Sequence, residues 1–187
     1  MIKKIKVRVI MMLVLFWVVG CTSVPSQFEI ADDVALLTTL EDVRNAKEQG
    51  QIARLAGLVA RVENLAERTR VEIVALPMTA SGRPLISAKP QARFVAYIDG
   101  YIESLEYTQG KPITVQGEVQ TSESGQVGEF EMTFPVLHAL EHQLWDINQR
   151  VRVDDFGSTI GCSPRSSLCH GFHPRFGHIE TYLTPSK

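Results

Sequence analysis

The sequence predicts a mainly β protein, a small OB-like β-barrel of five to six strands. Between residues 52 and 136, short segments alternate apolar and polar residues with a period of two, as strands with one buried face do. Turn-forming residues separate these segments, and Gly57 and Gly117 stand inside two of them, which is common at bends and bulges of small barrels. We expect a short N-terminal helix before the barrel and a loop-rich C-terminal tail after it.

The first twenty residues have the layout of a secretory signal peptide. Four basic residues between positions 3 and 8 precede an apolar run over residues 9–19, which ends at Gly20. The run is shorter than the roughly 20 apolar residues that a membrane-spanning helix needs. We therefore expect residues 1–20 to be removed from the mature protein.

The stretch VVGC at residues 18–21 resembles the lipobox of bacterial lipoproteins. The resemblance implies that Cys21 is the lipid-attachment residue and carries covalent diacylglyceryl and N-acyl groups; no other cofactor is expected. Two or more acyl chains hold a protein firmly on a membrane, whereas one holds it only marginally. Thr22 stands where an aspartate would favour the inner membrane, so the same resemblance implies the outer membrane. Residues 21–37 are expected to form a lipidated tether.

The charge of the mature chain excludes one class of partner. The formal net charge is −2, and removing the four basic residues of the signal peptide leaves the remainder at −6. A nucleic-acid-binding protein needs a basic face, so no nucleic acid is expected as a partner.

The mature chain divides into a helix, five strands and a tail. Thr38 and Glu41 have capping-box spacing and Gly50 stands where a helix would end, which predicts a helix over residues 39–49. Strands are predicted over residues 52–62, 70–76, 93–98, 111–120 and 126–136, with a turn over 122–125. In the first strand, the face expected to point to the core consists of Ala56, Leu58, Ala60 and Val62. The barrel domain then covers residues 38–145, and residues 146–187 form the loop-rich tail.

A set of stretches along this domain points to a known family. They are Gly50 with Gln51, Arg54, Gly57, Val62, Asn64, RTRVEIVALPM (68–78), GRP (82–84), QARFVAYIDGYIESLEY (91–107), GKPITVQGEV (110–119), GEFEMTFPV (128–136) and Trp145. Together they resemble the Slp family of starvation-inducible outer-membrane lipoproteins. The resemblance implies a role in envelope stress or stationary phase and implies no established catalytic residues. The tail after Trp145, with its two cysteines, departs from the family pattern.

A possible zinc motif lies near the end of the barrel. His138, Glu141 and His142 fit H-x-x-E-H, the inverted zinc-peptidase pattern. Two residues four apart lie about 6 Å apart on a helix and can share a metal ion. On a strand they lie about 13 Å apart and cannot. Because the alternation upstream, at Phe130 and Met132, continues through both histidines, we expect an extended chain with solvated histidines.

Cys162 and Cys169 form the second candidate site. In an oxidising compartment an even pair of cysteines normally bonds, and lipidation of Cys21 leaves these two as the pair, which predicts a disulfide. The alternative is a zinc or copper site made with His170 and His173, although the spacing lacks the C-x₂-C signature.

The sequence therefore predicts a non-enzymatic protein, lipid-anchored in the outer membrane and facing the periplasm. It would have a binding or structural role towards an envelope protein, a lipid or a cell-wall component. The alternative is a periplasmic metal-binding protein or zinc hydrolase that uses His138 and His142, or the cysteines and histidines of the tail. An OB-like barrel could also bind an oligosaccharide or peptide, but a fold alone does not establish this.

Overall fold

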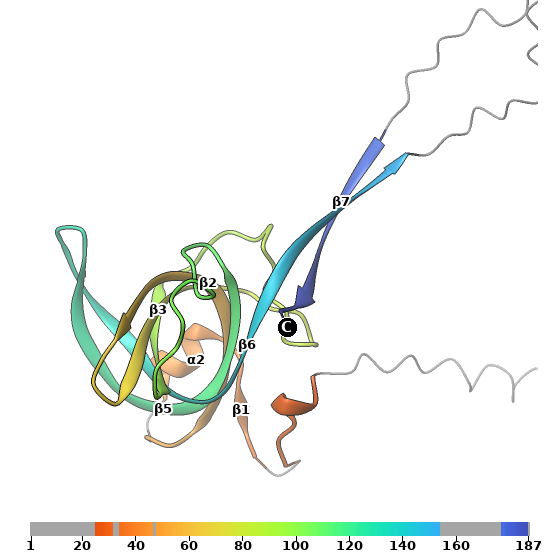
Figure 1. Ribbon diagram of the computed structural model, residues 1–187. Helices are drawn as coiled ribbons and strands as arrows, with labels where there is room; N and C mark the ends of the chain where they lie inside the picture. Colours follow the sequence, from red (N-terminus) through yellow and green to blue (C-terminus); the bar gives the residue numbers. More distant parts are fainter. Residues whose placement is uncertain (1–24, 32–33, 47, 154–176, 187) are drawn as a thin grey trace, which may run out of the picture.

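Strands dominate the structure, a computed structural model that describes residues 25–31, 34–46, 48–153 and 177–186 (Figure 1). This confirms the mainly β class. The elements in chain order are η1 (Ser26–Phe28), β1 (Leu36–Leu37), α2 (Leu40–Asn45), β2 (Ile52–Asn64), β3 (Arg68–Leu76), β4 (Arg93–Asp99), β5 (Pro112–Val127), β6 (Phe130–Val153) and β7 (Gly177–Pro185). Within these described ranges, no helix combines the length and apolarity needed to cross a membrane.

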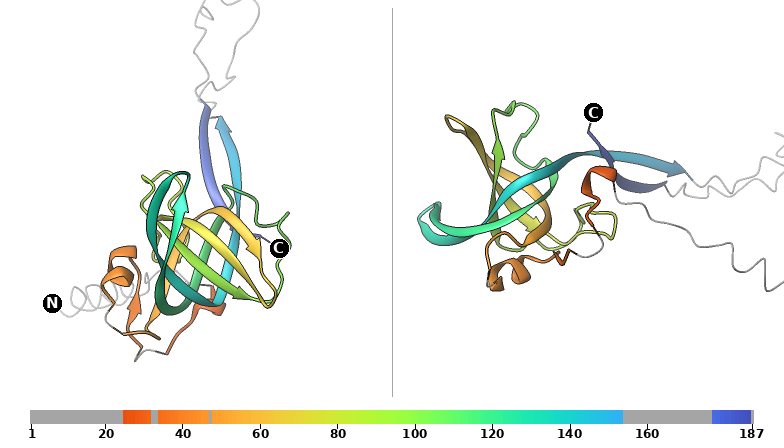
Figure 2. Two further views of the ribbon diagram at one scale, coloured as in Figure 1. Left: turned by 90° about the vertical axis from the view of Figure 1, so that its left-hand side faces the viewer. Right: turned by 90° about the horizontal axis from the view of Figure 1, so that it is seen from below.

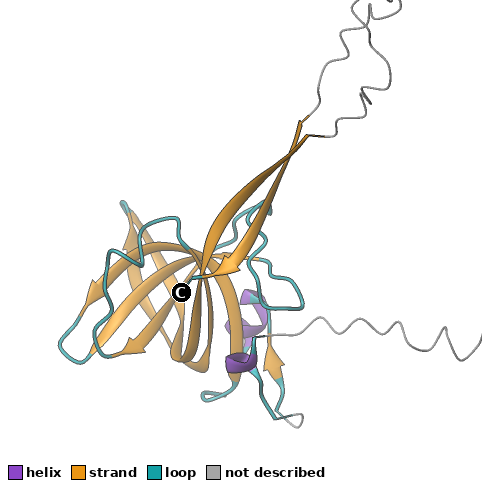
Figure 3. Ribbon diagram, turned by 45° about the vertical axis from the view of Figure 1, so that its right-hand side comes forward, coloured by secondary structure: helices purple, strands orange, loops and turns teal. Residues whose placement is uncertain are grey.

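Five strands close into a ring through hydrogen-bonded pairs. The circuit runs β2–β3–β4–β6–β5 and returns to β2. Its pairs are antiparallel except for β4 with β6, which run parallel. β1 pairs with the start of β2 in parallel, at Leu36 opposite Ile52. The strands curve around one interior (Figure 3), and the OB-like part of the prediction stays a prediction.

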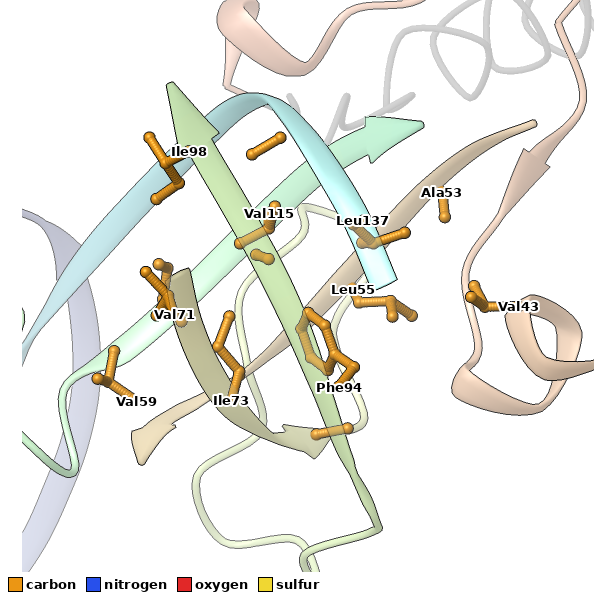
Figure 4. Close-up of a cluster of buried hydrophobic side chains, with 14 of the residues drawn as sticks. Val43, Ala53, Leu55, Val59, Val71, Ile73, Phe94, Ile98, Val115 and Leu137 are labelled. Carbon is orange, nitrogen blue, oxygen red and sulfur yellow. The ribbon is translucent and has the colours of Figure 1, made fainter. Parts of the chain in front are cut away.

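The interior of the ring is the main hydrophobic core (Figure 4). Each strand supplies alternate residues, as a sheet with one buried face requires. The period of two predicted between residues 52 and 136 is confirmed in β3 and β5. Their buried core residues are Val71, Ile73 and Ala75, and Ile113, Val115 and Val119. Leu40 and Val43 of α2 and Tyr107 of the loop before β5 join the same cluster.

The predicted core face of β2 is wrong in phase. The residues of β2 in the core cluster are Ala53, Leu55 and Val59. Between Val59 and Arg61 the pairing with β3 shifts by one residue, so Ala60 is a bulge. The bulge moves Val62 back to the core side, where it packs partly buried. When a period of two is extended through a bulge, the residues on one side of the bulge are assigned to the wrong face of the sheet.

The predicted turn over residues 122–125 is also wrong. β5 continues to Val127, which pairs with Phe130, so the turn consists of Gly128 and Glu129. Gly128 has φ +64°, a left-handed conformation that glycine adopts without steric cost and that two-residue hairpin turns require.

The helix is shorter than predicted and begins one residue later. Its N-cap is Thr39, whose side-chain oxygen accepts a hydrogen bond from the Asp42 backbone N–H at 3.1 Å. The cap is therefore Thr39 with Asp42, in place of the predicted Thr38 with Glu41. The helix ends at Asn45, and Gly50 lies in a separate turn.

Two segments predicted to be irregular are structured in part. The predicted tether, residues 21–37, contains η1, β1 and the fully buried Phe28. The predicted loop-rich tail contains the end of β6 and all of β7, which pair from Trp145 opposite Pro185 to Val153 opposite Gly177. The end of β6 is a strand because it pairs with β7, which lies about 30 residues further along the chain. The sequence of β6 alone does not reveal this partner. This two-stranded extension, called the arm below, projects away from the ring (Figures 1 and 2).

Candidate functional site

The described residue nearest to Cys21 is Pro25, and the segment that follows is packed onto the outside of the ring. Gln27 Nε2 donates to Gln143 Oε1 at 3.0 Å and to the His142 carbonyl at 3.4 Å. Phe28 is fully buried. The chain leading from Cys21 therefore meets the ring on β6, just before the arm begins.

One face of the arm, called its apolar face below, carries aliphatic residues on either side of one polar pair, Gln149 opposite Thr181. Residues directly opposite in an antiparallel pair share a face, and the register sets Ile147 opposite Leu183 and Val151 opposite Ile179. The exposed fractions are 50% for Ile147, 61% for Val151 and 66% for Ile179. Three aliphatic side chains thus stand open on one side of the arm.

The other face of the arm is polar. There Asn148 Nδ2 donates to Thr184 Oγ1 at 2.8 Å, and the Arg150 guanidinium lies 5.7 Å from the centroid of the Tyr182 ring. The aliphatic side chains of the arm are therefore concentrated on one of its two faces.

The attachment point of the N-terminal segment and the apolar face lie on the same side of β6. Successive residues of a strand point to opposite sides, so Gln143, Trp145 and Ile147 share one side. Gln27 contacts the first of these, and Ile147 begins the exposed apolar face. The chain that leads back to Cys21 thus lies on the side of β6 that bears the apolar face.

The H-x-x-E-H residues lie on a strand, as predicted, but their two histidines do not share a face. The pairing of β5 with β6 skips Leu140, so a bulge separates His138 from His142. His138 Nε2 lies 3.0 Å from Asp99 Oδ1, while His142 Nε2 lies 2.5 Å from the Tyr107 hydroxyl. The bulge turns the two rings to opposite sides of β6, so they cannot hold one ion between them.

His142 is a half-buried histidine, which corrects the prediction that both histidines are solvated. Burial lowers the pKa of His142, and the negative charge of Glu141 opposes that shift. Burial, with a smaller contribution from Glu106, raises the pKa of Tyr107 to about 12. The pair is therefore neutral near pH 7.

The described part of the chain lacks a cluster of metal ligands. There, no three or more His, Cys, Asp or Glu side chains come close enough to hold a metal ion. The second candidate set, Cys162, Cys169, His170 and His173, lies outside the described residues. Both the disulfide and the metal alternative stay predictions.

Comparison with known proteins identifies the family. A family model described as the outer membrane lipoprotein Slp family matches residues 18–170, most of the chain. The chain belongs to the Slp family. The match confirms the resemblance in the strands and begins at Val18, so it includes the VVGC stretch. As a member of the Slp family, the protein is an outer-membrane lipoprotein.

The names of individual relatives say little about function. An uncharacterised protein of Haemophilus influenzae is 29% identical over 96 residues, which cover 51% of this chain and 52% of that protein. The uncharacterised lipoprotein YeaY of Escherichia coli is 28% identical over 102 residues, 54% of this chain and 52% of YeaY. The outer membrane protein Slp of Escherichia coli is 25% identical over 138 residues, 73% of each chain. The chain spans about half the length of the first two curated relatives.

The sequence reading of this Slp-family chain missed two features. The arm was predicted to be a loop. The signal for a strand was present: Ile147 and Val151 lie an even number of positions apart, as residues on one face of a strand do. Arg54 was used only as a position of resemblance, although this arginine is 6% exposed and lines a pocket. The available signal was a single arginine among the otherwise apolar residues 52–60.

Proposed function

We propose that this outer-membrane lipoprotein is a non-enzymatic binding protein that lies against the membrane through the apolar face of its arm. In this arrangement the acyl groups on Cys21 anchor the chain and the arm orients the ring on the lipid surface. The observation that carries the proposal is that Gln27, near the anchor, contacts Gln143 on the side of β6 that bears Ile147.

The length of the connecting chain limits how far the ring can move from the membrane. Four residue steps separate Cys21 from Pro25, and an extended chain covers at most about 3.6 Å per residue. The packed segment therefore lies within about 14 Å of the lipidated residue. At that distance a nearby apolar face is held at the lipid surface.

Contact with an apolar surface would stabilise the arm. A two-stranded ribbon is marginally stable alone in water, and exposed aliphatic side chains grouped on one face are typical of a contact surface. Ile147, Val151 and Ile179 would gain by burial in the interfacial region of the bilayer. The polar face, with Arg150 and Asn148, would then face water.

A binding role without catalysis fits the family. The matched family and the named relatives are described as lipoproteins or outer membrane proteins, without a stated reaction. A role in envelope stress or stationary phase, facing the periplasm, remains part of the proposal through the resemblance described above.

The anchor is tested by mass spectrometry of the N-terminal peptide of the purified lipoprotein. The expected peptide begins at Cys21 and carries the mass of a diacylglyceryl group and an amide-linked acyl chain. An unmodified cysteine at this position would contradict the anchor.

The arm is tested by fluorescence quenching. The intact lipoprotein carrying Ile179→Trp is reconstituted into phosphatidylethanolamine–phosphatidylglycerol vesicles that contain brominated lipid. Strong quenching is expected for this variant and little for the matched control Phe130→Trp, an exposed residue at the other end of β6. Equal quenching of both variants, or of neither, would refute contact through the arm.

The metal-binding alternative now rests on Cys162, Cys169, His170 and His173. Mass spectrometry of unreduced protein separates it from the disulfide, because a disulfide lowers the mass by about 2 Da. Stoichiometric zinc or copper that a chelator removes, and that Cys162→Ser abolishes, would favour the metal site.

A further inference from the structure

A pocket opens where β2 meets β3. It has a volume of about 410 Å³ and lies beside the paired residues Ala56 and Leu76. One wall comes from residues 36–40 and the other from the loop that follows β3, up to Gly82. This volume lies within the range of small-molecule sites.

The pocket is lined by one charged side chain. Arg54 contributes the charge, and the rest of the described lining is mainly apolar, with polar side chains such as Thr38 and Gln91 at the edge. Apolar walls with a few polar groups are typical of a small-ligand site, in which the polar groups fix the orientation. The lining therefore suits a ligand with an apolar body and a single negative charge.

In the described part of the chain, the groups that hold Arg54 in place are neutral. Its Nε and Nη2 donate to Gln116 Oε1 at 2.9 and 2.7 Å, and Nη2 also donates to the Phe28 carbonyl. Among the described residues, Nη1 has no hydrogen-bond partner and no carboxylate pairs with the guanidinium. The side chain is only 6% exposed.

This arrangement leaves a positive charge to be balanced. Burying a charge without a counter-ion is costly, and one anion beside it removes much of that cost. Burial also lowers the pKa of Arg54, in keeping with a cation that lacks an acidic neighbour. Gln116 holds one edge of the guanidinium, which leaves Nη1 to bind an incoming anion.

We propose that this pocket binds a small monocarboxylate with an apolar chain, of the fatty-acid class, whose carboxylate pairs with Arg54. A monocarboxylate matches the single cation, whereas a phosphate monoester would bring a second negative charge into a chain that is already acidic. The inference goes beyond the membrane contact proposed above, because neither the pocket nor Arg54 involves the arm.

The probes are octanoate, octyl phosphate and octanol, which share one chain length and differ in the head group. Calorimetric titration uses the intact lipoprotein in nanodiscs, with the signal of empty nanodiscs subtracted. Saturable binding of octanoate is expected, tighter than that of octanol by ~10-fold or more, because hydrogen bonds to charged groups are strong. Equal binding of octanoate and octanol, tighter binding of octyl phosphate, or no saturable binding would overturn the proposal.

Variants test the role of Arg54. Arg54→Gln is expected to weaken octanoate binding ~10-fold or more. The matched control is Arg61→Gln, which removes the same charge from an exposed position of the same strand and should leave binding unchanged. Unchanged binding in Arg54→Gln would overturn the assignment.

A second variant tests the pocket while leaving the contact between Arg54 and Phe28 intact. Ala80 is exposed and lines the pocket, so Ala80→Trp should narrow it without disturbing the core. Loss of octanoate binding in this variant supports the pocket, and full retention overturns it. These results are independent of the quenching of Ile179→Trp, so the two proposals can fail separately.

Discussion

The Arg54 guanidinium lies 5.3 Å from the centroid of the Phe28 ring and also donates to the Phe28 carbonyl. Through these two contacts the strand β2 holds a segment 26 residues earlier in the chain. The Phe28 side chain is fully buried, with an exposed fraction of 0%. The N-terminal segment is therefore part of the folded unit, and the connection to Cys21 is short.

Removing the Phe28 ring should destabilise the whole domain. Phe28→Ala is expected to lower the free energy of unfolding by about 3 kcal/mol, because it empties a buried site and removes the cation–π contact. Urea unfolding followed by the fluorescence of the buried Trp145 measures the change. Phe130→Ala is the control, since Phe130 is 78% exposed and its loss should cost about 0.5 kcal/mol or less. Similar values for both variants would show that Phe28 is not integrated.

The loop after β3 should depend on one buried hydroxyl. Trp145 Nε1 donates to Thr114 Oγ1 at 2.9 Å, and the same hydroxyl donates to the Gly82 carbonyl at 2.6 Å. Thr114→Val leaves both partners unsatisfied and should cost about 1–3 kcal/mol in unfolding free energy. Denaturant unfolding tests this, with the exposed Thr133→Val as control. A cost no larger than that of the control would argue against this bridge.

Gly57 should not tolerate a side chain. A Cβ built there would lie 2.1 Å from the Val74 carbonyl oxygen, which is backbone and cannot move aside. Gly57→Ala is therefore expected to destabilise the protein by about 2 kcal/mol or more, or to prevent folding. At Gly110 a Cβ would meet no atom within 4 Å, and only its φ of +85° opposes substitution. Gly110→Ala should cost about 1 kcal/mol, and an equal or larger loss there would contradict the close-approach argument.

Stability should fall as the pH drops below about 6.5, the ordinary pKa of histidine. Because burial lowers the pKa of His142, the unfolded chain binds a proton at this residue more readily than the folded chain does. The stabilisation from neutral His142 is complete above the unfolded pKa and is lost as the pH falls towards the folded pKa. Chemical unfolding between pH 8 and 5 measures this dependence. His142→Gln should flatten it and His138→Gln should retain it; the reverse pattern would assign the effect to the wrong histidine.

Much of the ring could be predicted from alternation alone. The core residues of β3 and β5 follow the period of two that the sequence predicts. The same rule failed at Ala60 and Leu140, where pairing with a neighbouring strand skips one residue. A bulge is a property of the pair of strands, and the sequence of one strand does not contain it.

The candidate site was less predictable than the fold. His138 and His142 share a motif in the sequence, yet the bulge at Leu140 turns them to opposite sides of β6. Arg54 and Gln116 share no motif, yet the pairing of β2 with β5 sets them directly opposite each other. Chemistry assembled across strands depends on register, which distant parts of the chain determine together.

The sequence by itself determined the class of the protein. The signal-peptide layout, the VVGC stretch, the period-two strands and the family pattern depend on the order of neighbouring residues, so they can be read locally. Only the tertiary structure decided how the ring closes, where its bulges lie, how Phe28 covers Arg54, and that Ile147 and Ile179 share one face of an arm. The physical reason is that each of these depends on hydrogen-bonded pairing between segments far apart in the chain, which a pattern along one segment does not specify.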